Sequence, residues 1–373
     1  MSENKYEECL SWSKQKGLEL DHRVERKKVN GVYGMYATAP IPKGTVVASF
    51  PVKSTMSIRT DFKYPDKTHK QTKWIHAAAI MLSEGKNSEN SGYVKMFETP
   101  EELHSNCAFY FSNEEYAFLQ KMNPLCYTSL LVMRTMAINQ LKIIHEIDPK
   151  LDLELIMQAI LNGFSRVWTE YGFLPIIDLF NHSNTEAASL GLTNNNKSVG
   201  YTTTKDYVTD EQVWGCYGMK DMYSHAAYYN YFDPNSTHII DYGSRAIQTI
   251  SNPAVTAYIA QIYKCQFIQW NGEKKFRILE PNLFFLENEP SKELMSYLTN
   301  TSFCTNKEFL EKKCSHHSIY TTLLYIINSF LDANKVDNYK LAQVPQKLRR
   351  FHQLLKKEKK IMQQNLDWAT KQL

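Results

Sequence analysis

Four short segments of this 373-residue sequence carry residue types and spacings that suit chemistry at a bound ligand. The first is Gly31-Val32-Tyr33-Gly34-Met35, where glycines let the backbone approach a ligand closely. The second is DLFNHS at residues 178–183, in which Asn181 and His182 end an apolar run. Asparagine and histidine at the end of a strand present hydrogen-bonding groups that suit an adenosine ring.

The third segment is Ser165-Arg166, at the end of an expected helix, where the planar arginine fork suits a ligand carboxylate. The fourth is DEQVWGCYG at residues 210–218, an acidic turn that leads into a strand ending in Tyr217-Gly218. A phenol held there can orient a nucleophile or contact a transferring methyl group. A second pair, Tyr242-Gly243, follows, but only the first comes after the acidic turn and before the aromatic run at 228–235.

Each of these segments, taken alone, is more typical of an ordinary tight turn, a strand end or a surface arginine than of a ligand site. Their order along the chain is what indicates a single site.

The elements that must position these residues fall into a β module interrupted by helices. The pattern predicts a helix within residues 5–20, then a hairpin within 29–58 around a Pro-Lys-Gly turn. Helices are expected around Trp74, at 130–144 and at 155–167, the last with Asp152 as its N-cap. Strand signals return at 173–179 and 212–217.

Beyond Pro253 the pattern is mostly helical, with helix starts expected at Ser291 and Thr305. The last helix has one apolar stripe, and its other side carries the basic cluster of residues 347–360. The stripe consists of Leu348, Phe351, Leu355, Met362, Leu366 and Ala369.

Composition narrows the class of protein. Hydrophobic residues make up 43% and charged residues 22%, the balance of a folded chain with two or three domains. The net charge of +4 gives no reason to expect a nucleic-acid binder. Seven scattered cysteines without a C-x-x-C pair indicate neither a disulfide framework nor a zinc site, so no metal is expected. Without an apolar signal core or a membrane span, we expect a soluble protein of the cytoplasm or nucleus.

Taken in order, these segments resemble the SET-domain methyltransferases of the RuBisCO large-subunit methyltransferase class, which includes the actin-histidine methyltransferase. The resemblance covers nearly the whole chain. The pieces that carry it are YGMYATAPIPKGTVV, FSRVW, LPIIDLFNHS, DEQVWGCYG and the C-terminal RRFHQLLKKEKKIMQQNLDW.

The resemblance implies an α+β fold: a β-rich SET domain with an inserted helical block, followed by an all-helical C-terminal substrate-binding domain. The implied boundaries are 1–66 and 166–250 for the two parts of the SET domain, 67–165 for the insert and 251–373 for the C-terminal domain. The implied cofactor is S-adenosyl-L-methionine. Its expected contacts are Tyr33, Gly34, Met35, Arg166, Asp178, Leu179, Phe180, Asn181 and His182, with Arg166 on the cofactor carboxylate.

Tyr217 is the expected catalytic residue, and a protein lysine is the preferred methyl acceptor. Desolvation in an aromatic channel would lower the pKa of that lysine, as attack requires. The candidate channel walls are Tyr228, Tyr229, Asn230, Tyr231 and Phe232, although some of these aromatic residues are expected to be plain core packing.

Three alternatives stay open. The same architecture accepts a histidine if its channel supplies a hydrogen-bonding partner such as Asn230. The chain is alternatively a catalytically silent SET-like module that grips a protein partner. The third alternative is nucleic-acid binding by the basic cluster at 347–360, but a basic helix side is usually solvated. The expected partner is a protein substrate, and the chain is expected to be a monomer.

Overall fold

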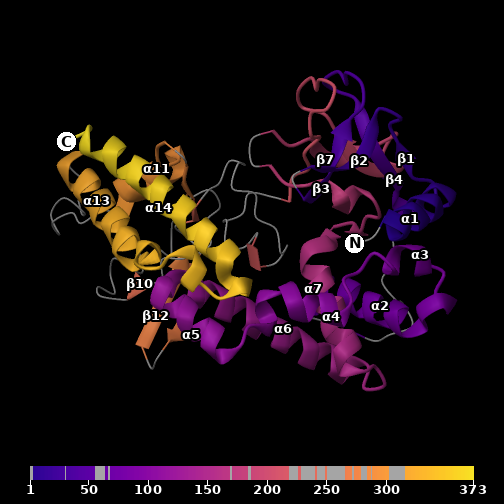
Figure 1. Ribbon diagram of the computed structural model, residues 1–373, viewed down its shortest axis with the longest axis horizontal. Coiled ribbons are helices and arrows are strands. Elements are labelled where there is room, and N and C mark those ends of the chain that lie inside the picture. The colour runs from indigo at the N-terminus through magenta and orange to yellow at the C-terminus, as the bar shows by residue number, and fades with distance from the viewer. Residues whose placement is uncertain are drawn as a thin grey trace. The chain divides into compact units, whose positions relative to one another are not determined.

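A computed structural model describes the chain at residues 3–29, 31–54, 64–65, 68–168, 170–183, 186–217, 226–227, 240–241, 248–249, 265–270, 273–278, 284–286, 288–301 and 316–373. The chain divides into two compact units. Unit 1 consists of Met1–Tyr110, Val132–Gly218 and Tyr228–Asn230, and unit 2 of Phe111–Leu131, Met219–Ala227 and Tyr231–Leu373. Figure 1 labels the elements of both.

A four-stranded antiparallel sheet forms the β core of unit 1. Its strand order is β1 (Glu19–Leu20), β4 (Val46–Pro51), β8 (Ser198–Thr202), β7 (Ser189–Thr193). The two central strands are buried along most of their length, and Gly200 of β8 pairs with Ser49 of β4. A Cβ atom on Gly200 would lie 2.2 Å from the carbonyl oxygen of Ala48, so only glycine allows this approach.

The hairpin of unit 1 differs from the one expected within residues 29–58. Strand β3 (Val32–Ala37) pairs with β2 (Val24–Val29), and β4 belongs to the other sheet. The Pro-Lys-Gly turn does form, with Gly44 at φ +84° and the Thr45 amide donating to the Pro42 carbonyl. The tighter turn at Gly31, also at φ +84°, makes the hairpin, because left-handed backbone there returns β3 directly onto β2.

The helices expected around Trp74, at 130–144 and at 155–167 all form. The helices of unit 1 are α1 (Glu3–Gln15), α2 (Lys70–Glu84), α3 (Ser91–Val94), α4 (Pro100–Asn106), α7 (Leu153–Arg166) and the part of α6 (Pro124–Ile147) that follows residue 131. The expected N-cap is confirmed, since the Asp152 carboxylate accepts from the amides of Glu154 and Leu155. Helices α2 and α7 pack closely at Gly163, where a Cβ would lie 2.6 Å from Ile75.

Two expected strands are corrected. Of residues 173–179, only Phe173 is in a strand, the short pair of β5 (Val167–Trp168) with β6 (Gly172–Phe173), and Ile177–Leu179 is a 3-10 turn. Residues 212–217 form no regular strand; Gln212 and Gly215 make isolated bridges to two different neighbours. A segment shared between two partners cannot build a continuous ladder with either.

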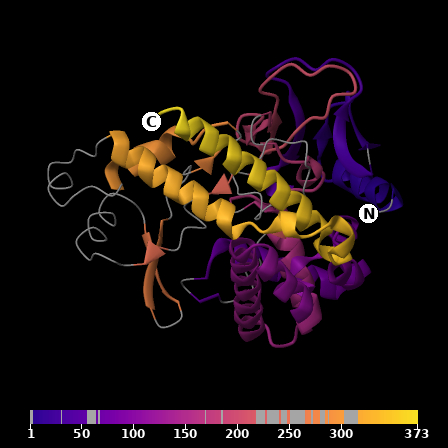
Figure 2. The ribbon, with the colours of Figure 1, turned by 60° about the vertical axis from the view of Figure 1, so that its left-hand side comes forward.

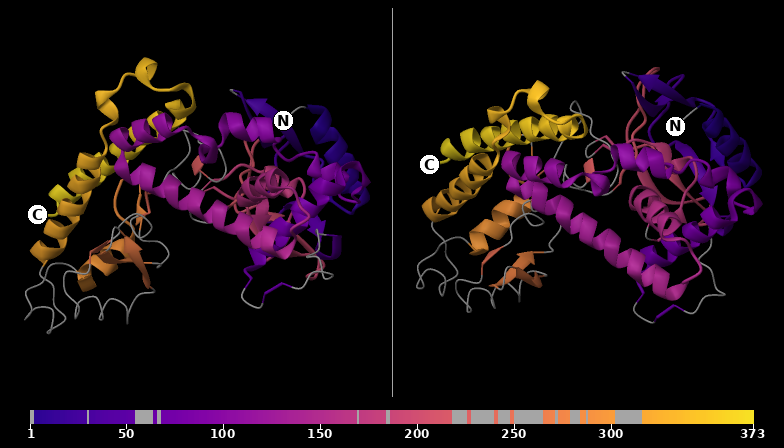
Figure 3. Two further views of the ribbon diagram at one scale, coloured as in Figure 1. Left: turned by 90° about the horizontal axis from the view of Figure 1, so that it is seen from below. Right: turned by 60° about the horizontal axis from the view of Figure 1, so that its bottom comes forward.

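Unit 2 contains α5 (Asn113–Met122), the start of α6, α11 (Lys292–Thr301), α13 (His316–Ala333) and α14 (Arg349–Thr370). Figures 2 and 3 show α13 and α14 side by side, and the two helices pack together. The stripe of the last helix is confirmed at Leu348, Phe351, Leu355, Met362 and Ala369, which are buried. None of the described helices is both long and apolar enough to cross a membrane.

The region 251–373 differs from the expected all-helical domain, because it also carries the strands β11 (Cys265–Trp270), β12 (Glu273–Ile278) and β13 (Phe284–Phe285). Two further strands, β9 (Ile240–Asp241) and β10 (Gln248–Thr249), come before it, in the range expected for the SET domain. Strands β10, β12 and β11 form one antiparallel sheet, and β13 pairs with β9. The α+β class as a whole is confirmed. The helix start expected at Thr305 lies outside the described residues.

A buried carboxylate holds part of unit 2 together. Glu358, on the apolar side of α14, has no exposed surface and accepts from the side-chain amides of Asn123 and Asn334 at 3.1 and 3.2 Å. Asn123 comes from the segment at 111–131, and Asn334 follows α13. The carboxylate thus joins three stretches of unit 2, and residue 358 is not part of a solvated charged side.

Replacing Glu358 by alanine is therefore expected to lower the free energy of unfolding by roughly 3 kcal/mol, since the mutation leaves a cavity and a buried amide donor without its acceptor. Chemical denaturation followed by circular dichroism measures the loss. The control is Gln353→Ala, an exposed position of the same helix, which should change stability little. Equal losses in the two variants would contradict a structural role for the buried carboxylate.

Candidate active site

The segment at 211–217 lies between residues 31–35 and residues 178–183, the first two segments that the sequence indicates for ligand binding. All three belong to unit 1. The Val213 amide donates to the Met35 carbonyl of β3 at 2.8 Å. Two residues on, the Gly215 amide donates to the Asn181 carbonyl at 2.7 Å, and the Ser183 amide donates to the Gly215 carbonyl. Three stretches far apart in the sequence therefore meet at one place.

Glycines make this crossing possible. A Cβ on Gly34 would lie 2.4 Å from the side-chain nitrogen Nε2 of Gln212 and 3.1 Å from the side-chain nitrogen Nδ2 of Asn181. A Cβ on Gly215 would lie 2.6 Å from the Tyr201 hydroxyl oxygen. A larger residue at either position would have to displace these side chains, so Gly34 and Gly215 suit the close packing at the crossing.

Asn181 and His182 are tied to the other two segments. The Asn181 side-chain amide donates to the Tyr33 carbonyl at 2.8 Å, and the Nδ1 atom of His182 accepts from the Tyr217 amide at 3.0 Å. His182 is buried, and its ring stacks on that of Tyr217 with centroids 5.3 Å apart. Because Nδ1 accepts, the proton of the neutral imidazole lies on Nε2.

Tyr217 is fixed at both ends. Its backbone amide donates to the His182 side chain, and its hydroxyl donates to the Phe180 carbonyl at 2.8 Å. A phenol has one hydrogen and two acceptor lone pairs. With the hydrogen directed at a carbonyl, the oxygen presents lone pairs to a further donor, so Tyr217 is arranged to accept an N–H.

A charged cluster lies beside the crossing. Arg166, at the end of α7, pairs with Asp178 at 2.8 Å and donates to the Met96 carbonyl, and the Tyr93 hydroxyl donates to the same Asp178 oxygen at 2.5 Å. The side chain of Asp178 is 1% exposed and that of Arg166 is 11% exposed. The second carboxylate oxygen of Asp178, Oδ1, is buried and has no hydrogen-bond partner in the described part of the chain.

The electrostatics of the cluster follow from this burial. Desolvation alone would lower the pKa of Arg166, but the negative charge of Asp178 raises it, and the net shift is upward. Burial, with the Asp178 charge adding to it, raises the pKa of Tyr93 well above its usual value, so this phenol stays a donor. Burial also raises the pKa of the nearby Cys9 thiol to about 12, which makes it an inert neutral group.

The remaining predicted contacts fall into two groups. Met35 and Phe180 are fully buried, with no exposed surface on either residue. Tyr33 and Leu179 are partly exposed. The predicted channel residues, Tyr228, Tyr229, Asn230, Tyr231 and Phe232, lie outside the described residues, as does Gly218. In the described ranges, no group of His, Cys, Asp or Glu side chains is arranged to hold a metal ion.

Sequence reasoning missed Tyr93 and Gln212. Tyr93 lies in the one-turn helix α3, 85 residues before its partner Asp178, and nothing in its local sequence marks it. Gln212 accepts from the Tyr36 hydroxyl at 3.1 Å and packs on Gly34. Its place directly after the acidic turn was the available signal.

Comparison with known proteins identifies the family and the fold. A SET domain family model matches residues 32–218, about half of the chain. Rubisco LSMT bound to sinefungin and monomethyllysine is similar to the chain with a TM-score of 0.62 at 15% identity, over 100% of this chain and 92% of that one. The SET domain of LSMT bound to lysine and AdoHcy has a TM-score of 0.60 at 14% identity, over 99% and 91%.

The likeness to these structures establishes the fold. Rubisco LSMT bound to AdoMet is similar to the same degree, with a TM-score of 0.62 at 15% identity over 100% of this chain and 92% of that one. No curated protein sequence matches the chain.

Proposed function

This chain belongs to the SET domain family, and we propose that it is an S-adenosyl-L-methionine-dependent protein methyltransferase that N-methylates a lysine side chain. The observation that carries the proposal is the crossing of residues 211–217 between β3 and the Asn181-His182 segment, which fixes Tyr217 against the 178–183 segment that also holds the buried Asp178. The similar structures support it, since they hold AdoMet, AdoHcy, lysine or monomethyllysine.

The residues at the crossing fit the proposed cofactor. Its amino-acid end carries an ammonium and a carboxylate, and the Arg166–Asp178 pair offers the opposite charges side by side. The partnerless Oδ1 of Asp178 suits an ammonium donor, and such orphaned buried acceptors are rare in folded proteins. Arg166 has five N–H groups, of which two have acceptors among the described residues, so donors remain for a carboxylate. Asn181 and His182 supply the backbone wall for the adenosine.

When bound, the cofactor supplies an electrophilic methyl group on a sulfonium. The protein has then to hold a neutral amine collinear with that methyl in a site without bulk water. Tyr217 is arranged to orient the amine, because its oxygen accepts one N–H and leaves the nitrogen lone pair directed elsewhere. His182 and Phe180 hold the phenol in place, so this orientation needs no rearrangement during the reaction.

The direct test is to incubate the protein with radiolabelled cofactor and a cell lysate, then to identify the labelled protein and map the modified residue by mass spectrometry. Label on a lysine supports the proposal. Label on a histidine would replace it by protein-histidine methylation on the same fold. If no protein is labelled and calorimetry detects no heat of cofactor binding, a catalytically silent binding module is favoured.

Cofactor binding should raise the melting temperature of the protein, because a ligand that binds only the native state stabilises it by mass action. Asn181→Ala is expected to shrink this thermal shift, since the mutation removes the bond that holds Tyr33 against the Asn181-His182 segment. The melting temperature without cofactor is measured alongside, to separate stability from binding. The control Asn139→Ala, at an exposed position of α6, should keep the full shift. A full shift in Asn181→Ala would show that the site is misplaced.

A further inference from the structure

The exposed side of α14 carries a row of cations. Positions 349, 353, 356, 360, 363 and 367 are all exposed and recur at helical spacing, so they form one stripe opposite the buried residues. Arg349, Lys356 and Lys360 belong to this stripe, and Asp367 ends it. The charge of the stripe is therefore positive over its first three turns only.

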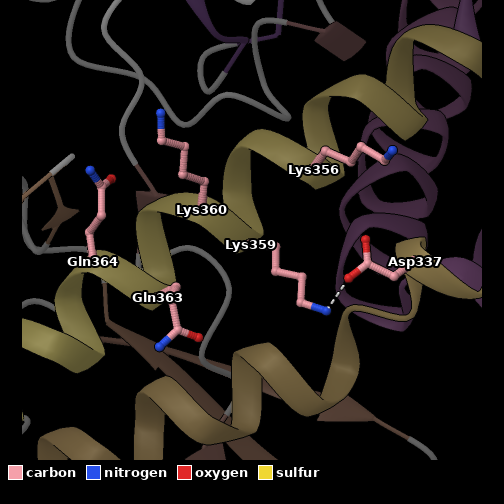
Figure 4. Close-up of a pocket in the computed structure, with 6 residues that line it drawn as sticks. All are labelled: Asp337, Lys356, Lys359, Lys360, Gln363 and Gln364. Carbon is pink, nitrogen blue, oxygen red and sulfur yellow. Dashed lines mark hydrogen bonds and ion pairs between the residues drawn. The ribbon is translucent and has the colours of Figure 1, made fainter.

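A shallow pocket of about 420 Å³ lies on this surface of unit 2, lined by Asp337, Lys356, Lys359, Lys360, Gln363 and Gln364. In Figure 4, a dashed line joins Lys359 to Asp337, and the ammonium of Lys360 points away from that pair. Gln363 donates to Asp367 at 3.0 Å. The pocket thus combines lysine ammonium groups with amides that can both donate and accept.

Two lysines of the pocket have no counter-charge among the residues that the structure describes. Lys359 pairs with Asp337, but neither Lys356 nor Lys360 makes an ion pair or hydrogen bond with any described residue. Arg349 is likewise without a described partner. Like charges at positions i and i+4 destabilise a helix slightly, so Lys356 and Lys360 gain nothing from each other.

We propose that this stripe and pocket bind an acidic, extended segment of the protein substrate, a docking site separate from the site of methyl transfer. Lys356 and Lys360 are one turn apart, about 6 Å along the helix axis, and alternate residues of an extended strand are about 6.6 Å apart. Carboxylates at every second position of a peptide therefore match the axial spacing of the two lysine positions. From position 349 to position 360 the row spans about 16 Å, the length of roughly five extended residues. The proposal rests on the proposed function only for its statement that the segment belongs to the substrate.

The charges around the pocket favour a peptide over a nucleic acid. Asp367 closes one end of the stripe and Asp337 lies in the pocket wall, so a continuous phosphate backbone along α14 would meet carboxylates. A short acidic peptide ends before it reaches Asp367, and its backbone can hydrogen-bond the amides of Gln363 and Gln364.

The test measures fluorescence anisotropy of the full-length protein with a labelled peptide that alternates glutamate and serine, at low salt and without cofactor. Binding by the protein and none of the glutamine-serine peptide are expected. Lys356→Glu/Lys360→Glu should weaken binding about 10-fold or more, since two attractions become repulsions. The control is Lys86→Glu/Lys142→Glu, two exposed lysines of unit 1, which changes the net charge equally and should have little effect.

Equal weakening by both double variants would overturn the proposal, because binding would then depend on net charge alone. Tighter binding of a short DNA duplex than of the acidic peptide would overturn it in favour of a nucleic-acid surface. Both variants exchange exposed residues, and circular dichroism checks that they fold. If the peptide binds but no lysate protein is methylated, the docking site is supported and the proposed function is contradicted. If a lysate protein is methylated but the peptide does not bind, the proposed function is supported and the docking site is contradicted.

Discussion

Replacing Tyr217 by phenylalanine is expected to lower the turnover number about 10²-fold or more while cofactor and substrate binding persist. The mutation removes one oxygen and keeps the ring that stacks on His182. If that oxygen orients the attacking amine, its loss removes an interaction expressed mainly in the transition state, so kcat falls and KM changes little. Single-turnover methylation of the labelled substrate measures the effect.

Stability is a separate measurement for this variant. The Phe180 carbonyl loses the hydroxyl that donates to it, which costs about 1 kcal/mol in unfolding free energy. A loss of that size leaves the protein folded, so a collapse in turnover cannot be attributed to unfolding. The cofactor thermal shift of Tyr217→Phe should match that of the wild type.

The matched control is Tyr242→Phe, which removes the same atom from the second Tyr-Gly pair and should leave turnover nearly unchanged. Tyr242 lies outside the described residues, directly after β9. If the two variants exchange their outcomes, the later Tyr-Gly pair carries the chemistry, and Tyr242 is the catalytic residue in place of Tyr217.

Local features of this chain were predictable because local sequence determines them. Asp152 caps α7 through its own side chain and the next turn, and the apolar stripe of α14 follows from helical periodicity alone. The strands β11 and β12 were missed in spite of a local signal. Asn271-Gly272 stands between the two strands, and that dipeptide is the strongest short hairpin signal.

The site was predictable only in part, for a different reason. Periodicity can indicate a strand but not its partner, and residues 211–217 make isolated bridges to two partners. The sequence could mark Arg166 and Asp178 separately, but not that they pair in a buried cluster with Tyr93. Glu358 shows the same limit, because a carboxylate in a basic helix reads as solvated until Asn123 and Asn334 are placed around it.

Replacing Arg166 by methionine is expected to have the largest effect on stability, a loss of about 3–5 kcal/mol in unfolding free energy. The mutation leaves the Asp178 carboxylate buried with Tyr93 as its remaining described partner, and an uncompensated buried charge is costly. Denaturant unfolding without cofactor measures the loss. Arg23→Met is the control: Arg23 pairs with Asp21 at 2.7 Å but is more exposed, so a much smaller loss is expected.

The double variant Arg166→Met/Asp178→Asn separates the two roles of the cluster. Removing both charges should recover much of the lost stability, because no buried ion is left without a partner and the Tyr93 hydroxyl still has an amide oxygen to donate to. The cofactor thermal shift should nevertheless be absent in the double variant, since the proposed partners of the cofactor's carboxylate and ammonium are both gone. If the double variant regained the full shift, Arg166 and Asp178 would serve only each other, and the cofactor's charged end would have to lie elsewhere.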